Sequence, residues 1–313
     1  MLHKNIPKII VFVTSICVFC FIFSNCSSVS PNSSNSTAGK VSDQSKNFND
    51  PEVVGRIKTD EITESSGLVQ SRCDPRVFWT HNDSGDKELI YAINENGERL
   101  GTWKVAGAKN NDWEDMATLR DKSGKCFIFF GDIGNNSREK TRFAIYKVGE
   151  PTVTGESKKS TKKMPLTTDV AEAIAFSYPD GTFDAETLLV HPVNGDIFVV
   201  TKTIFGGASV FKIGPQTTKV GEISVPAIPN GFLTGGEISP DGRRIILSDY
   251  VAAYELRLPE GVENFDEIWK QTPDKVILGD REQGEAICYS TDGKKIYATS
   301  EKKNSPVIRV SSK

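Results

Sequence analysis

The sequence predicts an all-β fold, a β-propeller of five four-stranded blades, and three observations support this prediction. A glutamate precedes a short strand-like segment five times, at intervals of 50, 72, 51 and 48 residues. A repeat of about 50 residues is typical of propeller blades. The segments are separated by turn residues, and no strongly helical stretch interrupts them. The five repeated residues are Glu64, Glu114, Glu186, Glu237 and Glu285.

The chain begins with a predicted export signal. Lys4 and Lys8 form a positively charged segment before an apolar run, 9–23. This run is long enough for a signal peptide and short for a membrane span. The run ends in Phe-Ser-Asn-Cys, which resembles a bacterial lipoprotein signal. We therefore expect residues 1–26 to be a lipoprotein signal peptide in which Cys26 is lipidated and becomes the new N-terminus. The lipid would anchor the protein to a membrane of the cell envelope, in the inner or outer leaflet. A signal anchor or an ordinary signal peptide is the alternative.

Residues 27–50 are rich in Ser, Asn, Thr and Gly and contain few apolar residues, so we expect a flexible tether. The remaining residues, 51–313, suffice for one large all-β domain. Removing residues 1–26 changes the net charge from −3 to −5, since that segment holds two lysines and no acid. A mildly acidic domain without a Lys/Arg cluster argues against nucleic acid as a partner.

Each blade is expected to contain four short strands bounded by turns. The predicted strands are 66–70, 77–81, 89–94 and 100–105; 116–120, 126–132, 142–148 and 170–178; 187–191, 196–201, 209–213 and 218–225; 237–239, 244–249, 252–258 and 275–278; and 285–290, 295–300 and 307–310. The fifth blade lacks a strand, which the N-terminal segment 52–58 can supply, so that no edge stays open. A polar insert at 155–163 explains the long interval. A sixth blade hidden there is the alternative.

Three cysteines follow Cys26. Cys73 and Cys126 occupy similar places in successive blades, so a disulfide is one expectation for an exported protein, although separate thiols are favoured. Cys288 lies in an apolar strand and is expected to pack in the core.

The innermost strand of each blade lines the central channel, so a glutamate at the start of each would place a ring of carboxylates around the axis. Crowded carboxylates either take up protons or bind a cation. We therefore expect the five glutamates to bind a metal, and oxygen donors favour Ca²⁺. Chance, or solvated strand ends, is the alternative explanation.

Two polar loops follow the second strands of blades one and two. Their Asp and Asn oxygens suit Ca²⁺ better than zinc, while a plain turn role is the alternative. His81 is the candidate acid–base imidazole, and Lys202 would pair with a carboxylate, hold an anionic ligand or lie on the surface. The predicted ligand pocket comprises Asn82, Asp83, Asp115, Asp132, Asn135, Asn136, Asp184 and Lys202.

Six blocks of sequence carry a resemblance: 64–68, 78–85, 112–117, 131–136, 184–192 and 283–287. Together they resemble a largely uncharacterised family of exported bacterial β-propeller proteins, over nearly all of residues 61–310. The likeness implies a propeller and export but no reaction. The layout of one glutamate per blade is also similar to calcium-activated nucleotidases (apyrases), which implies a central Ca²⁺. Their nucleotide-binding residues have no convincing match here.

Two functions follow from these expectations. The favoured one is a lipid-anchored, Ca²⁺-binding module that presents one face to a protein or small-molecule ligand. The other is a Ca²⁺-dependent hydrolase of phosphoesters, esters or lactones, in which His81 or an acidic residue activates water. No Gly-x-Ser-x-Gly elbow, P-loop or dinucleotide motif is present.

Overall fold

The computed structural model describes residues 46–203, 207–223 and 232–313. The predicted signal peptide, Cys26 and the tether before residue 46 lie outside this part of the chain. Within it, no helix is long and apolar enough to cross a membrane.

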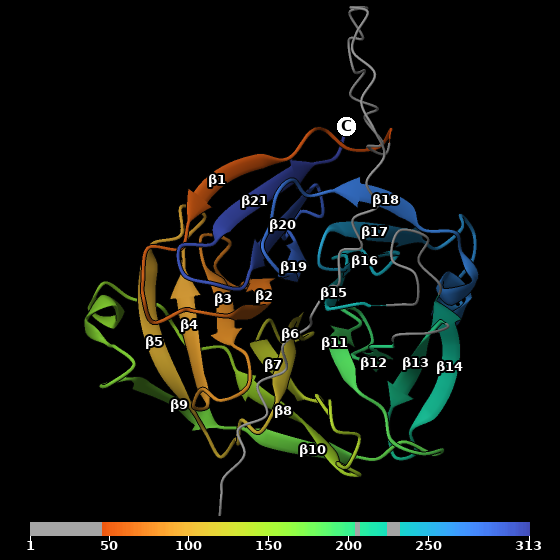
Figure 1. Ribbon diagram of the computed structural model, residues 1–313, viewed down its shortest axis with the longest axis horizontal. Coiled ribbons are helices and arrows are strands. Elements are labelled where there is room, and N and C mark those ends of the chain that lie inside the picture. Colours follow the sequence, from red (N-terminus) through yellow and green to blue (C-terminus); the bar gives the residue numbers. More distant parts are fainter. Residues whose placement is uncertain (1–45, 204–206, 224–231) are drawn as a thin grey trace, which may run out of the picture. The chain divides into compact units, whose positions relative to one another are not determined.

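Five sheets are arranged in a ring, which confirms the predicted five-bladed propeller (Figure 1). One strand of each sheet lies nearest the axis and contacts the corresponding strands of both neighbouring blades. These innermost strands are β2 (Ser65–Gln70), β6 (Trp113–Arg120), β11 (Ala185–Val190), β15 (Gly235–Ile238) and β19 (Gly284–Tyr289).

The other strands follow outward in each blade. Blade one adds β3 (Phe78–Asn82), β4 (Leu89–Ile93), β5 (Arg99–Ala106) and β9 (Leu166–Val170). Blade two adds β7 (Cys126–Asp132), β8 (Phe143–Gly149) and β10 (Glu172–Phe176). Blade three adds β12 (Ile197–Thr201), β13 (Ala208–Ile213) and β14 (Thr218–Ile223). Blade four adds β16 (Arg244–Ser248), β17 (Ala252–Arg257) and β18 (Asp274–Ile277). Blade five adds β20 (Lys295–Ser300), β21 (Pro306–Ser311) and β1 (Glu52–Arg56).

The core lies between neighbouring blades, where apolar side chains of two sheets pack face to face. Five apolar clusters fill the five interfaces. Between blades one and two, Trp113 stacks on Phe130 with ring centroids 4.7 Å apart, and Trp79 meets Trp103 edge-on at 5.0 Å. Strands packed on both faces are buried at nearly every residue, because each blade is covered on both sides.

The N-terminal strand closes the ring, as predicted. β1 pairs antiparallel with β21, and the Glu52 carboxylate accepts a hydrogen bond of 2.7 Å from Arg309 beside this pairing. Blade five is therefore completed by residues from both ends of the described chain, and β1 covers the outer edge of β21.

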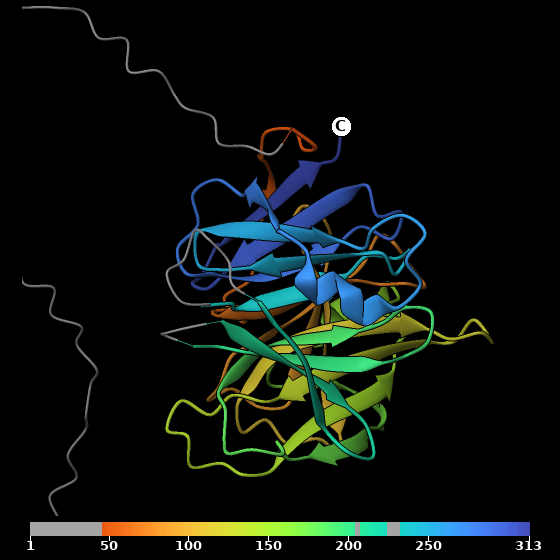
Figure 2. The same ribbon diagram turned by 90° about the vertical axis from the view of Figure 1, so that its right-hand side faces the viewer.

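The polar insert after blade two does not form a sixth blade. It contains the short 3-10 helix η1 (Glu156–Lys159) and leads into β9, which pairs in parallel with β5 of blade one. β9 was not predicted, because most of its residues are exposed and its sequence therefore lacks an apolar alternation. A second 3-10 helix, η2 (Phe265–Lys270), contacts β14 and β17 on the outside of blades three and four (Figure 2).

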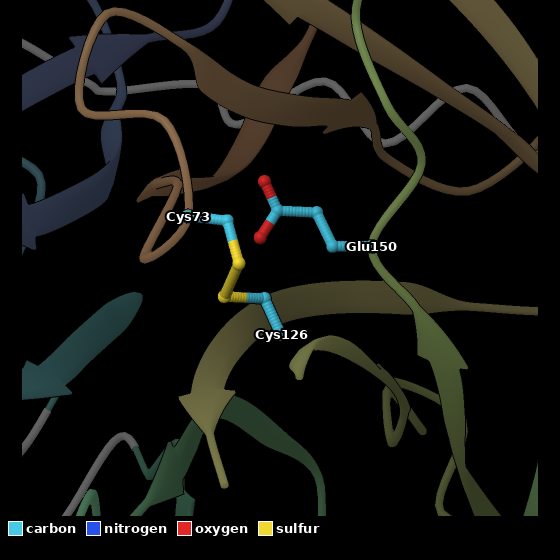
Figure 3. A group of neighbouring side chains, drawn as sticks. All are labelled: Cys73, Cys126 and Glu150. Atoms are coloured by element: carbon cyan, nitrogen blue, oxygen red, sulfur yellow. A yellow bond between two sulfur atoms is a disulfide. The ribbon is translucent and has the colours of Figure 1, made fainter. Parts of the chain in front are cut away.

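A disulfide joins blades one and two. Cys73, just beyond β2, is bonded to Cys126 at the start of β7, with Cα atoms 6.1 Å apart, and Glu150 lies beside the bond (Figure 3). Of the two alternatives that the sequence left open, separate thiols were favoured, and this preference is wrong. The paired inner strands bring the two residues within bonding distance. Cys288 is free and buried, as expected.

Removal of this disulfide should destabilise the propeller. A Cys73→Ser/Cys126→Ser variant should unfold with a free energy lower by about 2–4 kcal/mol, because the unfolded chain loses its cross-link. Denaturant unfolding without reductant measures the difference, and reduced wild-type protein should match the variant. Peptide mapping that recovers Cys73 and Cys126 as two free thiols would contradict the assignment.

Candidate functional site

The innermost strands all begin at one end of the channel, and the second strands end there. Each blade brings these two places together through an antiparallel pair, such as Ser65 opposite Asn82 and Trp113 opposite Asp132. We call this end the acidic mouth. Its carboxylates interact electrostatically with one another. They are Glu64, Asp83, Asp112, Glu114, Asp184, Glu186, Glu285 and Glu301.

Three of these carboxylates form the tightest group. Asp83 follows β3, Asp112 precedes β6, and Glu114 lies in β6; each offers an oxygen within 4.8 Å of the oxygens of the other two. Glu114 is only 5 % exposed. Burial raises its pKa well above the usual range, and the charges of Glu186, Asp83 and Asp112 raise it further. The Asp83 Oδ1 atom is buried and has no hydrogen-bond partner among the described residues.

Gly134 leaves the space that this group occupies. A Cβ atom at this position would lie 2.0 Å from Glu114 Oε1 and 2.5 Å from Asp112 Oδ2. Any larger residue would therefore displace both carboxylates. The Gly134 amide also donates a hydrogen bond of 3.2 Å to the Asp112 carbonyl, which fixes the loop after β7 against the start of β6.

β-Bulges decide which residue of each innermost strand faces the mouth. Blades one, two, three and five have a register shift at the first residues of the innermost strand, and blade four has none. A bulge adds one residue and re-aims the side chains beside it. The residues within these bulges include Ser66, Glu114, Glu186 and Glu285.

The five predicted glutamates are therefore not equivalent. Glu114, Glu186 and Glu285 share the bulge position, while Glu64 stands one residue before β2 and is exposed. Glu237 lies deeper in β15, opposite Ile246, a register place that Met116 occupies in blade two. There Glu237 accepts a hydrogen bond of 2.8 Å from Arg72 and one of 2.6 Å from the Tyr289 amide. The structure thus separates Glu237 from the acidic mouth.

Lys202 supplies positive charge to the mouth. Its ammonium contacts the Glu186 carboxylate and donates a hydrogen bond of 2.8 Å to the Tyr250 hydroxyl. Burial nevertheless raises the pKa of Glu186 to about 7, although Lys202 opposes this shift. Of the three alternatives that the sequence left open for Lys202, pairing with a carboxylate is the one that the structure shows.

Glu285 and Glu301 form a second crowded pair. Burial, together with the charges of Glu186 and Glu301, raises the pKa of Glu285 to about 10, and the pKa of Glu301 is also raised by burial. The Glu285 Oε2 atom is buried without a hydrogen-bond partner among the described residues. Hence this side of the mouth holds a proton at neutral pH unless a cation replaces it.

Most of the other predicted pocket residues hold the loops in place. Asp132 accepts hydrogen bonds from Asn111 and from the Asp112 amide and pairs with Lys140 at 2.7 Å. The Asn135 amide donates to Asp184 at 2.7 Å. These contacts orient the carboxylates from behind, as second-layer groups do around bound ions.

Three further predicted residues lie apart from the carboxylate group. The Asn82 side chain accepts hydrogen bonds from the Thr63 and Glu64 amides. Asp115 is fully buried and accepts from the Leu188 and Gly236 amides, so it ties neighbouring innermost strands together. Asn136 is exposed in the loop between β7 and β8.

His81 lies in the core between blades one and two. It is fully buried beside Trp113 and Phe130, and its Nδ1 atom lies 2.9 Å from the Asn82 carbonyl oxygen. Burial lowers its pKa, so the imidazole stays neutral. The end of β3 thus contributes Asp83 to the acidic mouth, whereas the His81 side chain lies among aromatic rings in the core.

The sequence analysis did not select Asp112, Glu301, Tyr250 or Gly134. Asp112 and Asp184 each lie two residues before a bulge glutamate, and this shared spacing is the signal that could have found Asp112. Glu301 and Tyr250 follow second strands, β20 and β16, at places where blades one and two carry their polar loops.

Comparison with known proteins yields distant structural likenesses alone. No protein-family model and no curated protein matches the chain, so the resemblances noted in the sequence stay predictions. A gluconolactonase from Xanthomonas campestris is similar over 85% of this chain and 94% of its own, with 10% identity and a TM-score of 0.45. A putative 6-phosphogluconolactonase from Bacteroides uniformis is similar over 80% and 68%, with 14% identity and a TM-score of 0.38. Neither likeness bears on the activity of this chain.

Proposed function

We propose that the protein is a Ca²⁺-dependent binding propeller whose cation is held by Asp83, Asp112 and Glu114 at the acidic mouth. One observation carries this proposal: three carboxylate oxygens from two blades lie within 4.8 Å of one another. The group includes a buried oxygen, Asp83 Oδ1, that finds no hydrogen-bond partner in the part of the chain that the structure describes. A cation would supply the missing partner and offset the repulsion.

The donor set favours Ca²⁺ over transition metals. All three side chains offer carboxylate oxygens, which are hard ligands, and neither a thiolate nor an imidazole belongs to the group. Ca²⁺ takes about six to eight oxygen ligands, so three side chains leave positions for water or for oxygen atoms of a ligand. A ligand rich in hydroxyl or carboxylate oxygens therefore suits this mouth.

Calcium should stabilise the folded protein, and Gly134→Ala should weaken its binding at least tenfold, because the new methyl group displaces Glu114 and Asp112. A tenfold loss corresponds to about 1.4 kcal/mol. Calorimetric Ca²⁺ titration after EDTA treatment gives the affinity, and the melting temperature should fall with EDTA and recover with Ca²⁺.

Gly155→Ala is the matched control, since a Cβ at Gly155 meets no atom within 4 Å and its backbone is helical. It should bind Ca²⁺ like the wild type. The proposed site would be contradicted if the Gly134→Ala variant bound Ca²⁺ with wild-type affinity, or if the wild-type protein did not respond to Ca²⁺.

The cation-free protein should lose stability as the pH rises. The pKa of Glu186 is raised to about 7 and that of Glu285 to about 10, so the folded state binds protons more tightly than the unfolded state. The unfolding free energy should then fall as the pH rises from about 4.5, first through 7 and then towards 10, by about 1.4 kcal/mol per pH unit for each group.

Denaturant unfolding in EDTA between pH 5 and pH 9 measures this slope. Glu285→Gln should flatten the profile above pH 7, whereas Glu263→Gln, an exposed change elsewhere, should leave it as in the wild type. A wild-type profile without slope over this range would show that these carboxyls do not hold protons in the folded state.

A second function, Ca²⁺-dependent hydrolysis of phosphoesters, esters or lactones, is favoured by one observation. Glu186, with a pKa raised to about 7, lies beside Lys202 and its charge acts on Glu114. A carboxyl with this pKa suits a general base near neutral pH. In that function the cation would polarise the substrate, and Glu186 would accept the proton of the attacking water.

Hydrolysis would be detected with chromogenic phosphate and acetate esters and with lactones, each in Ca²⁺ and in EDTA. This function predicts that Glu186→Gln lowers kcat at least 100-fold while Ca²⁺ affinity stays within a few-fold of the wild type, because Glu186 is not among the three proposed ligands. Glu263→Gln should retain full activity. Turnover equal to buffer in all three substrate classes would leave ligand binding as the function.

A further inference from the structure

A cavity of about 410 Å³ lies between blades four and five, outside the three-carboxylate group. The loop from β18 to β19 forms one wall, and the loop from β20 to β21 forms the other. We call it the blade-five cavity. Its lining includes four basic residues, Arg56, Arg281, Lys302 and Lys303, and three acidic ones, Asp280, Glu282 and Glu301. Lys302 is paired with Glu282 at 2.8 Å.

Lys303 is paired with Asp60 at 3.5 Å, whereas the other two basic residues, Arg56 and Arg281, form no ion pair in the described part of the chain. Arg56 is exposed, while Arg281 is partly buried and is acted on by the charges of Asp249 and Glu285. Arg281 is therefore the partly buried cation of this lining that forms no ion pair.

The Arg281 guanidinium donates to the Thr299 and Asp249 carbonyls and to the Ser248 hydroxyl, and no carboxylate in the described chain lies within 4.0 Å of it. Its Nε atom is buried and has no hydrogen-bond partner among the described residues. Burial lowers the pKa of Arg281 to about 10. An unpaired, partly desolvated guanidinium is a strong site for an anion.

A glycine holds the guanidinium in this place. A Cβ atom at Gly284, the first residue of β19, would lie 2.2 Å from Arg281 Cζ. The absent side chain thus lets Arg281 rest on the backbone of an innermost strand, next to Glu285 of the acidic mouth.

A second unpartnered group lines the same cavity. Ser305 is 4 % exposed, and its hydroxyl has no hydrogen-bond partner in the described part of the chain. A hydroxyl can donate to an anionic oxygen, and a buried hydroxyl that stays unpaired is unfavourable. Gln283, Lys302 and Asn304, all in the two wall loops, have positive φ angles of 48°, 73° and 58°. Such backbone strain is concentrated at ligand sites.

We propose that the blade-five cavity binds the anionic oxygen group of a small molecule, a carboxylate or a phosphate, with Arg281 as the charge partner and Ser305 as a further donor. Arg presents several N–H donors in a plane, which matches both anionic groups. This site does not depend on the proposed Ca²⁺ site, and it makes an acidic small molecule the class of ligand for this end of the propeller.

The test uses acetate and methyl phosphate as probes with the purified protein, at constant ionic strength and in EDTA, so that no cation contributes. Titration calorimetry should show saturable binding of at least one probe to wild-type protein. Binding of acetate alone assigns a carboxylate, methyl phosphate alone a phosphate, and binding of both the shared anionic oxygen group. Arg281→Gln should weaken this binding at least tenfold.

Arg142→Gln is the matched control, because Arg142 is exposed in blade two and the substitution removes the same charge. It should bind the probes like the wild type. If Arg281→Gln does not fold, Gly284→Ala tests the same contact, since it keeps the charge but displaces the guanidinium. Wild-type protein that binds neither probe, or an Arg281→Gln or Gly284→Ala variant with unchanged affinity, would overturn the proposal. These titrations are made in EDTA, so their expected outcomes are the same whether or not the proposed Ca²⁺ site exists.

Discussion

Repulsion between carboxylates at the acidic mouth is the constraint on which this end of the structure depends. Glu114, Glu186 and Glu285 lie near the starts of the innermost strands of blades two, three and five, and the propeller draws all five innermost strands together around one axis. Burial removes the water that would screen their charges, so their pKa values rise. Lys202 compensates part of this charge, and the rest must be met by protons or by a bound cation. The proposed cation site at this mouth rests on the same crowding.

The loops next to the acidic mouth fix the positions of its crowded carboxylates. Gly134 lets the β7 loop approach Glu114 and Asp112 closely, while Asp132 and Lys140 hold that loop from behind. Blade four differs, because β15 lacks a bulge and contributes the glycine backbone of Gly235 and Gly236 at this level. The mouth is therefore asymmetric, with carboxylates concentrated on blades one, two, three and five.

The two proposed sites place opposite charges at the same end of the molecule. Arg281 rests on Gly284, the residue before Glu285, and the blade-five cavity includes Glu301, which also belongs to the acidic mouth. A molecule with hydroxyl oxygens at one end and an anionic group at the other matches this pairing of a cation site with a guanidinium. Ca²⁺ binding and the effect of Arg281 on anion binding are measured separately, so the two proposed sites are tested independently.

The sequence by itself determined the blade number, the closing strand and the carboxylate-rich mouth, because blade period and strand alternation are local properties of the chain. Tertiary structure decided the rest. A bulge shifts the register by one residue, and its presence in blade two but not in blade four separated Glu114 from Glu237. Packing between blades placed His81 beside Trp113 and Phe130 in the core. The Cys73–Cys126 bond, β9 and the Asp83–Asp112–Glu114 group all join segments distant in sequence or in different blades, and no local pattern encodes such contacts. The lipid anchor on Cys26 stays a prediction.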